Sequence, residues 1–390
     1  MTPSARLQAA IELLDAIVTA ARDQGPAADT LIAAYFKARR YAGSGDRRAI
    51  RELVYRAIRR AGERPESGRA AMLGLAGDDP ELRALFDGAP HGPAPIVAGE
   101  PAAPASAVPA WLAPQLAHVD AAALLGRAPL DLRVNTLKAT RDDVLAALPA
   151  AHATRFAPHG IRLDEPLAVE QHPLWRDGLV EVQDEGSQLI ALACRAAPGE
   201  TVIDLCAGAG GKTLALAADM RGEGRLIAAD SDRGRLSRLP VRAERAGASN
   251  IESRLLDPNR EAEALADLAG ATDCVLVDAP CSGTGTWRRN PEARWRLTPE
   301  RLARLTALQA RLLDLAATLV RPGGRLVYAV CSLLDEEGAR QADGFLARHP
   351  GWSAHRPFDE PGTERGQGVL LSPAADGTDG FFVAALTCPC

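Results

Sequence analysis

The sequence predicts an α/β domain with a mostly parallel sheet, preceded by a small α+β domain and an N-terminal all-helical domain. Three observations support this prediction. Residues 4–86 carry apolar side chains at helical spacing, residues 87–108 are rich in proline, and apolar strands alternate with helix-length segments from about residue 180 onward. Strands that alternate with helices favour parallel pairing through right-handed crossovers. We therefore expect a helical region at 1–88, a Pro/Gly/Ala-rich linker at 89–108, a small α+β domain at 109–178 and the main α/β domain at 179–390.

The N-terminal region is predicted to form short amphipathic helices with one strongly basic stretch. Basic side chains are concentrated between residues 37 and 60, where Asp46 and Glu52 are the only acidic residues. A solvated helix face normally has mixed charges, so this local excess favours contact with RNA phosphates over an ordinary surface face. The stretch contains Lys37, Arg39, Arg40, Arg47, Arg48, Arg51, Arg56, Arg59 and Arg60, of which we take Arg39, Arg40, Arg47 and Arg48 as the RNA-binding candidates.

The proline-rich segment 89–108 is expected to be an extended linker. The small domain that follows is predicted to have a helix near 110–125, a strand through 130–134 and a second helix near 141–148. A polar region of strands and turns completes it.

Composition excludes several classes of protein. The 390 residues are 47% hydrophobic and 24% charged, and no apolar stretch is long enough to cross a bilayer, so we expect a soluble, cytoplasmic protein without a membrane partner. The net charge of -5 argues against a protein that coats nucleic acid. Seven scattered cysteines predict neither a disulfide framework nor a metal site, and the closing Cys388 and Cys390 are interpreted as incidental.

The regular part of the chain places its polar residues directly after predicted strands. Strands are expected at 201–205, 225–229, 251–256, 273–278 and 325–331. Ligands of parallel sheets bind beyond the carboxyl ends of the strands. We therefore expect the functional site at this edge.

A glycine-rich loop follows the first of these strands and precedes a helix that is expected to start near Lys212. Its glycines allow a ligand to approach the backbone closely at the start of this helix. A phosphate-binding Walker loop would need glycine where Cys206 stands, and a dinucleotide fingerprint would need glycine where Thr213 stands. The remaining candidate is S-adenosylmethionine, held around its methionine half. The loop residues proposed to bind this cofactor are Cys206, Ala207, Gly208, Ala209, Gly210, Gly211 and Lys212.

Two further carboxylates fit the same cofactor. Asp230 ends the second strand, where an acidic side chain can bind both ribose hydroxyls, and Asp257 ends the third, near the expected position of the adenine amino group. A carboxylate at a strand end can also serve only as a helix cap. The combination with the glycine-rich loop favours cofactor binding for both.

Two cysteines are expected at the same edge, and Asp278 lies beside them. Cys281 follows the fourth strand and Cys331 ends the fifth. Carbon 5 of cytosine is too weakly nucleophilic to attack a sulfonium methyl group until a thiolate adds to carbon 6. One cysteine could therefore be the nucleophile and the other could assist release, while Asp278 could orient the base and also contact the cofactor. Spacing alone does not decide which cysteine has which role.

Several motifs resemble those of the Sun/Nop family of RNA cytosine methyltransferases. They are the loop from Asp204 to Lys212, the Asp278-Ala-Pro-Cys281-Ser-Gly block, the Arg288-Arg289-Asn290-Pro291 run, the Val330-Cys331-Ser332 strand end and the closing Asp379-Gly380-Phe381-Phe382. The resemblance covers roughly residues 180–387 and implies a class I S-adenosylmethionine-dependent methyltransferase with a Rossmann-like sheet. It also implies that Cys331 is the nucleophile and that Cys281 aids product release, whereas DNA cytosine methyltransferases use the Pro-Cys cysteine.

The upstream region extends the resemblance. Residues 132–137 look like part of the family's small RNA-binding domain, and residues 41–60 look like a fragment of its NusB-like helical domain. The loop departs from the family pattern with Ala207-Gly208-Ala209 in place of Ala-Ala-Pro, and Val330 stands where threonine is usual. Neither departure removes a reacting group, although both lie near the cofactor.

The resemblance implies a monomeric enzyme that methylates carbon 5 of a cytosine in RNA, with bacterial 16S ribosomal RNA as the expected substrate. We also expect phosphate contacts from the arginines after the Pro-Cys loop, which are Arg288, Arg289, Arg294 and Arg296. One alternative is a DNA cytosine methyltransferase, but only residues 332–390 follow Cys331 to supply a target-recognition segment. The other is an RNA-binding ribosome assembly factor with an inactive methyltransferase fold.

Overall fold

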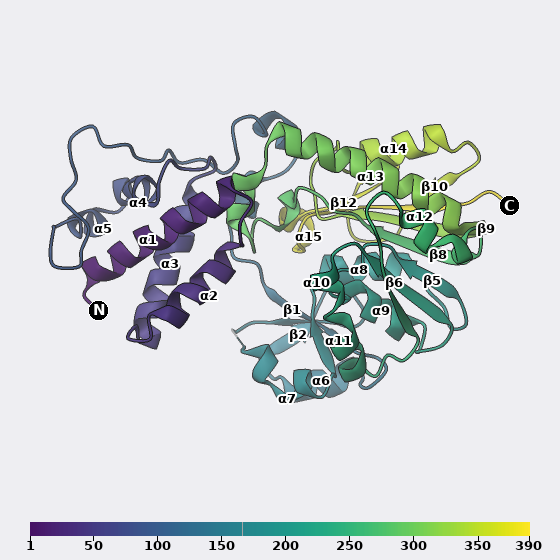
Figure 1. Ribbon diagram of the computed structural model, residues 1–390. Helices are drawn as coiled ribbons and strands as arrows, with labels where there is room; N and C mark the ends of the chain where they lie inside the picture. The colour runs from purple at the N-terminus through teal and green to yellow at the C-terminus, as the bar shows by residue number, and fades with distance from the viewer. Residues whose placement is uncertain (166) are drawn as a thin grey trace. The chain divides into compact units, whose positions relative to one another are not determined.

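The computed structural model describes residues 1–165 and 167–390; residue 166, within the predicted small domain, lies outside the described residues. It forms two compact units (Figure 1). The first, here the helical unit, contains Met1–Arg127 and Thr286–Pro299. The second, here the sheet unit, contains Ala128–Gly285 and Glu300–Cys390. The segment Thr286–Pro299 thus belongs to the helical unit, although the predicted boundaries placed it in the main α/β domain.

The helical unit confirms the amphipathic helices expected from the sequence. Its core side chains follow helical spacing, and Leu7, Leu14 and Ile17 of the first helix and Ile50 and Ile58 of the third have no exposed surface. Its elements are α1 (Pro3–Arg22), α2 (Ala28–Ala38), α3 (Ser44–Arg60), α4 (Gly68–Gly77), α5 (Pro80–Ala84) and the 3-10 turns η1 (Ala113–Leu116), η2 (Ala121–Leu124) and η6 (Pro291–Arg296).

The proline-rich segment packs onto these helices. Ala103 is 8% exposed; its N–H donates to the carbonyl of Ala70 at 2.9 Å, and its own carbonyl accepts from Arg60 Nη1 at 2.6 Å. The prediction of a helix near 110–125 is wrong. Two short 3-10 turns replace it, because Pro114 removes a backbone donor in η1 and Asp120 starts a new turn by capping η2.

The inserted segment Thr286–Pro299 satisfies backbone groups at two helix ends. Glu292 Oε1 accepts from the N–H of Ala28, the first residue of α2, at 3.0 Å. Arg294 donates to the carbonyls of Ile58 and Arg59 in the last turn of α3, the latter at 2.8 Å. Helix ends leave such groups without intrahelical partners, so these contacts explain why the segment belongs to this unit.

The sheet unit begins with a small antiparallel sheet of order β2-β3-β1-β4. The strand expected at 130–134 and the helix expected near 141–148 are both present. In the register, Leu132 pairs with Ile161 on one side and Val182 on the other. The elements are β1 (Leu130–Val134), α6 (Arg141–Ala147), β2 (Ala151–Ala153), β3 (Gly160–Leu163), η3 (Val169–Gln171), α7 (Pro173–Arg176) and β4 (Val180–Val182).

The main sheet has the order β11-β12-β13-β9-β8-β5-β6-β7, with β10 beside β13. β7, β6, β5, β8 and β9 run parallel, and they are the predicted strands. The remaining strands pair antiparallel and were not predicted. The strands are β5 (Thr201–Asp204), β6 (Arg225–Asp230), β7 (Ile251–Leu255), β8 (Thr272–Asp278), β9 (Val320–Val330), β10 (Ser353–His355), β11 (Thr363–Arg365), β12 (Gly368–Leu371) and β13 (Phe381–Thr387).

The strand order reverses at β5, because the chain proceeds from β5 to β6 on one side and returns to β8 on the other. Such a switch point opens a crevice at the carboxyl ends of the strands. The helices of this part are α8 (Glu185–Ala193), α9 (Gly211–Asp219), α10 (Arg233–Leu236), α11 (Leu239–Ala246), α12 (Glu261–Ala264), α13 (Pro299–Leu319), α14 (Ala339–Arg348) and α15 (Pro373–Asp376), with 3-10 turns η4 (Ala266–Leu268) and η5 (Thr284–Thr286).

Neither a bilayer-spanning helix nor a metal cluster is found in the described part of the chain. None of its helices is long and apolar enough to cross a membrane, and no group of three or more His, Cys, Asp or Glu side chains there is placed to hold a metal ion.

Candidate active site

The loop between β5 and α9 depends on two glycines in the left-handed region. Gly208 and Gly210 have φ angles of 56° and 86°, which other residues rarely adopt. A Cβ on Gly210 would also lie 2.2 Å from Leu239 Cδ1. Gly210 caps α9, which begins at Gly211, one residue before the expected start. The loop therefore directs the N–H groups of a helix start toward the carboxyl edge of the sheet.

Asp230 connects this loop to the end of β6. Its Oδ2 accepts a hydrogen bond from Gly208 N at 2.7 Å, and its Oδ1 accepts one from Asp232 N at 2.6 Å. The side chain is 7% exposed. Hydrogen bonds to an ionised acceptor are stronger than neutral ones, so the carboxylate holds the loop in its conformation.

A pocket of about 590 Å³ lies at the carboxyl ends of β5, β6, β8 and β9 and against α13. Small-molecule sites typically have volumes of about 300–1,000 Å³. The pocket brings together the predicted site residues Cys206, Asp230, Asp278, Cys281 and Cys331. Asp257 and the loop residues 207–212 are not among its lining side chains, although Leu256 and Pro258, on either side of Asp257, are.

A partly buried cation lies beside the pocket. Lys212 Nζ donates to Asp278 Oδ2 at 2.7 Å. Burial by itself lowers the pKa of Lys212, but the adjacent Asp278 carboxylate outweighs it and raises the pKa above its ordinary value. Beneath the loop, burial raises the pKa of Asp204 to about 7, and this side chain accepts from the hydroxyl of Thr213 at 2.7 Å. Lys212 therefore supplies positive charge at the base of the site.

The two cysteines of the pocket face each other. Cys281 follows β8, Cys331 follows β9, and these strands are parallel neighbours, so their ends lie side by side. The two Sγ atoms are 3.2 Å apart. The hydrogen bond to Cys331, together with burial, raises the pKa of the Cys281 thiol. One sulfur can carry the proton as a thiol and donate a hydrogen bond to the other sulfur, which is then a thiolate.

The sequence interpretation missed two polar side chains behind the Pro-Cys loop. Glu337 and Gln309 are fully buried, and both contact this loop. Gln309 could have been found, because it interrupts the apolar stripe that Leu302, Leu313 and Ala316 form on α13. Glu337 lies in an irregular segment and carries no such periodic signal.

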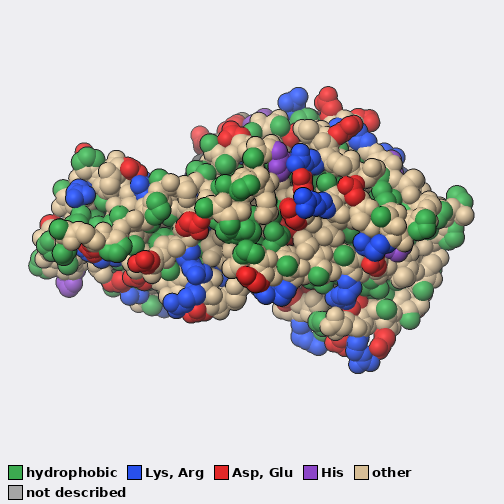
Figure 2. Space-filling model, turned by 90° about the horizontal axis from the view of Figure 1, so that it is seen from above, with side chains coloured by type: hydrophobic (Ala, Val, Ile, Leu, Met, Phe, Trp, Pro, Cys, Tyr) green, Lys and Arg blue, Asp and Glu red, His purple; other side chains and the backbone are tan. Residues whose placement is uncertain are grey.

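The basic stretch of the helical unit is more nearly neutralised than the sequence suggested. Its acidic partners come from other helices and turns, so the expectation that they are missing is wrong. The ion pairs are Arg39 with Glu12 at 3.3 Å, Arg56 with Asp79 at 2.9 Å and Arg60 with Asp78 at 2.5 Å. On the face of the molecule that Figure 2 draws, basic and acidic side chains are interspersed.

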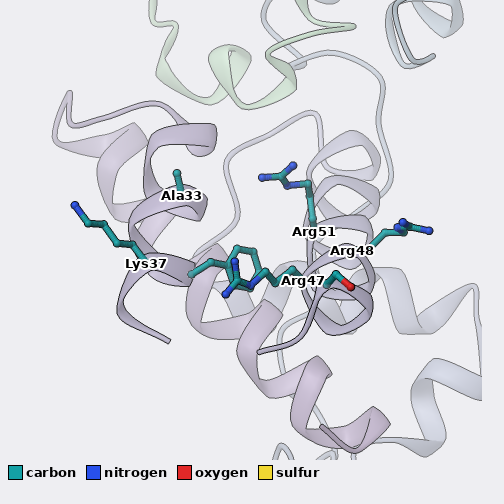
Figure 3. A pocket seen from close by; sticks show the side chains of 7 residues that line it. Ala33, Lys37, Arg47, Arg48 and Arg51 are labelled. Carbon is teal, nitrogen blue, oxygen red and sulfur yellow. The ribbon is translucent and has the colours of Figure 1, made fainter. Parts of the chain in front are cut away.

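Part of the stretch remains open to solvent. Arg40, Arg47 and Arg48 are exposed and are here called the basic patch. Arg47 and Arg48, with Lys37 and Arg51, line a pocket of about 560 Å³ between α2 and α3, and Lys37 and Arg48 point to opposite sides of it (Figure 3). Within the residues that the structure describes, Arg40 and Arg48 form no ion pair. The basic patch can therefore meet an anionic partner.

The prediction of phosphate contacts by the arginines after the Pro-Cys loop is wrong for Arg294, which is buried, whereas Arg296 is half-buried and its phosphate contact stays a prediction. Arg294 is 1% exposed and donates to backbone carbonyls of α3, while Arg296 donates to the carbonyls of Gly25 and Pro26 at 2.7 and 2.5 Å. These guanidinium groups stabilise the helical unit. Arg288 is 8% exposed, which disfavours direct phosphate contact, and Arg289 is half-buried and stays a prediction.

The Rossmann-like sheet, its antiparallel extension and the pocket at its switch point define the class I S-adenosylmethionine-dependent methyltransferase fold. Residues 191–387 match the family described as 16S rRNA methyltransferase RsmB/F, and residues 109–170 match its ferredoxin-like domain. The chain belongs to this family, which confirms the Sun/Nop resemblance. The matches begin at residue 109, so the NusB-like character of the N-terminal helices stays a prediction.

The chain is similar to several individual proteins. It is 38% identical over 272 residues to a probable ribosomal RNA small subunit methyltransferase B of Synechocystis, covering 66% of this chain and 59% of that protein. It resembles the solved methyltransferase homolog protein from Pyrococcus horikoshii with a TM-score of 0.60 and 28% identity, over 69% of this chain and 89% of the other. The structure of PH0851 shares the fold over 99% of both chains, with a TM-score of 0.79 and 23% identity. The chain spans about 60% of the length of the first curated relatives that it matches.

Proposed function

We propose that this protein transfers a methyl group from S-adenosylmethionine to carbon 5 of a cytosine in RNA, with Cys331 as the covalent nucleophile. The observation that carries the proposal is the 3.2 Å separation of two cysteine sulfurs at the edge of a methyltransferase pocket. A methyltransferase that acts on a nucleophilic oxygen or nitrogen needs no thiol. A pyrimidine carbon needs one to become nucleophilic.

The residues around the pocket suit S-adenosylmethionine. The carboxylate of Asp230 is placed to accept hydrogen bonds from ribose hydroxyls, and the glycine-rich loop offers backbone N–H groups at the start of α9 for the methionine carboxylate. Cys206, Asp278 and the segment around Asp257 complete the proposed cofactor site. When bound, this group supplies an electrophilic methyl.

The side chains of the pocket have distinct proposed roles. The Cys331 thiolate adds to carbon 6 of cytosine, and the electron pair of the carbon 5–carbon 6 double bond shifts so that carbon 5 can take the methyl group. A base then removes the carbon 5 proton, the electron pair of that carbon–hydrogen bond restores the carbon 5–carbon 6 double bond, and the bond between the Cys331 sulfur and carbon 6 breaks. Cys331 leaves as a thiolate, and Cys281 assists this release of the product. Asp278, held by Lys212 at 2.7 Å, orients the ring through a hydrogen bond and stabilises charge that develops there.

The proposed substrate is ribosomal RNA of the small subunit. The family description and the name of the Synechocystis relative both specify this RNA. We propose that the basic patch contacts its phosphates and that the small sheet of the ferredoxin-like domain also contributes to RNA binding. The affinity of such contacts depends strongly on salt concentration.

The test is bisulfite mapping of total RNA from cells that have or lack the gene, and from cells that carry only Cys331→Ala. We expect one or a few cytosines of 16S ribosomal RNA to lose their protection from bisulfite conversion both in cells that lack the gene and in cells that carry only Cys331→Ala. Unchanged protection everywhere would reject methylation of cellular RNA. Protection lost with the gene but retained with Cys331→Ala would reject Cys331 as the nucleophile.

A further inference from the structure

The loop that carries Cys281 is held on both sides of that residue. Gln309 Nε2 donates to the carbonyl of Pro280 at 2.9 Å, and the N–H of Ser282 donates to Glu337 Oε1 at 2.8 Å. Because both immediate neighbours of Cys281 are held, the backbone position of Cys281 is restrained, which limits where its sulfur can lie. This arrangement keeps its sulfur against that of Cys331 at 3.2 Å.

Glu337 is the centre of this arrangement. Its side chain has no exposed surface, and its carboxylate accepts from Ser282 N–H, the Ser282 hydroxyl and, at 3.0 Å, Gln309 Nε2. A carboxylate that meets only donors is suited to the ionised form. The backbone carbonyl of Glu337 also accepts from the Tyr328 hydroxyl at 2.6 Å, which fixes this segment to β9.

We propose that Glu337 is a positioning residue that holds the Pro280–Ser282 loop and keeps Cys281 protonated, so that Cys281 donates its S–H to Cys331 and leaves Cys331 as the nucleophile. This inference rests on the proposed covalent chemistry and extends it. It assigns a physical reason for the choice between two cysteines whose sulfurs lie only 3.2 Å apart.

The charges around the two sulfurs are unequal. The hydrogen bond with Cys331 and burial raise the pKa of the Cys281 thiol. The negative charge of Glu337, which is buried behind Cys281, raises this pKa further. On the other side stands Lys212, whose own raised pKa owes part of its shift to Cys331. An anion behind one sulfur and a cation facing the other favour a thiol at Cys281 and a thiolate at Cys331. The other titratable groups that line the same pocket are Cys206, Asp230, Asp232, Arg235, Glu261, Asp278, Arg301 and Arg311, and Tyr328 of β9 interacts electrostatically with Cys281.

The test measures the two thiols separately in the full-length protein without RNA. Iodoacetamide labelling over a pH series, read by mass spectrometry of the two cysteine peptides, gives the pH of half-maximal reactivity for each. In the wild type we expect Cys331 to react at lower pH than Cys281. In Glu337→Gln, which keeps the shape but removes the charge, we expect the Cys281 profile to move down by about one pH unit.

Two further variants control the measurement. Glu337→Asp retains the charge and should leave Cys281 close to its wild-type profile. Glu364→Gln removes a carboxylate whose side chain is 84% exposed on β11 and should change neither thiol. Thermal unfolding of each variant reports whether the fold is retained.

The inference is overturned if a folded Glu337→Gln protein keeps the wild-type Cys281 profile. It is also overturned if Cys281 reacts at lower pH than Cys331 in the wild type, a measurement that stands even where the variant does not fold. Labelling requires neither RNA nor cofactor. A wild-type protein that shows the expected thiol order but methylates no RNA would therefore count against the proposed function alone.

Discussion

Substitution of Asp230 tests the cofactor site, because this carboxylate is the proposed acceptor for the ribose hydroxyls. Both of its oxygens also accept backbone hydrogen bonds that hold the loop. Gly208 N lies 2.7 Å from Oδ2 and Asp232 N lies 2.6 Å from Oδ1. Asp230→Asn keeps the size of the side chain but turns one oxygen into an amide donor. That donor must face one of the two N–H groups, so the loop loses one of its fixed contacts.

The expected magnitude follows from these contacts. Loss of a charge-assisted hydrogen bond to a ribose hydroxyl costs about 1.5–3 kcal/mol, which corresponds to a dissociation constant about 10- to 150-fold higher. Asp230→Asn should fall near the lower end of this range, because one carbonyl acceptor remains. Asp230→Ala removes both loop contacts and the acceptor, so it should fall at the upper end.

Isothermal titration calorimetry with S-adenosylmethionine measures both variants against Asp164→Asn, which makes the same change at an exposed carboxylate of the small domain. We expect the Asp164 variant to bind like the wild type. Affinities of the two Asp230 variants within twofold of the wild type, in folded protein, would refute the placement of the ribose at Asp230.

Three other predictions concern the cysteines, the inserted segment and the basic patch. Cys331→Ala should bind cofactor but form no RNA adduct, whereas Cys281→Ala should accumulate a denaturation-resistant protein–RNA band; the opposite pattern on gels would exchange the two roles. Arg294→Ala should lower the free energy of unfolding by on the order of 3 kcal/mol in urea titrations, because buried carbonyls of α3 lose their donor. A reduced salt dependence of RNA binding with unchanged stability would instead support a phosphate contact by Arg294. Alanine at all three positions of the basic patch should weaken RNA binding and reduce its salt slope by about 0.7 per lost phosphate contact on single-stranded RNA, and a slope equal to that of the Arg260→Ala control would exclude the patch as an RNA contact.

The sequence was informative where local patterns are sufficient. The parallel strands were predicted because a strand that is buried on both faces is a run of apolar residues. Parallel strands run in the same direction, so all their carboxyl ends lie at one edge of the sheet. The glycine-rich loop, Asp230 and the two cysteines could be found because each lies at or shortly after the end of a strand. The helices of the N-terminal region were predicted from apolar spacing, although the two turns at 113–124 were mistaken for one helix.

Contacts between distant segments could not be predicted in this way. The carboxylates that pair with arginines of α3 come from the segment that follows α4, and the sequence near α3 says nothing of them. Arg294 looked like an RNA contact because it follows the Pro-Cys loop, yet it is buried against carbonyls that are 235 and 236 residues away in sequence. The antiparallel strands after Cys331 were missed because they are short or depend on pairing with β9 and β13.

The sequence by itself therefore determined the fold class, the edge of the sheet that carries the site and the residue types available there. Only the tertiary structure decided which side chains meet: the two sulfurs at 3.2 Å, Lys212 against Asp278, and Glu337 behind the Pro-Cys loop. The physical reason is the range of the interactions. Helical and strand periodicity reflect burial of one face by neighbouring residues, whereas hydrogen bonds between buried polar groups depend on which remote segments fold against each other.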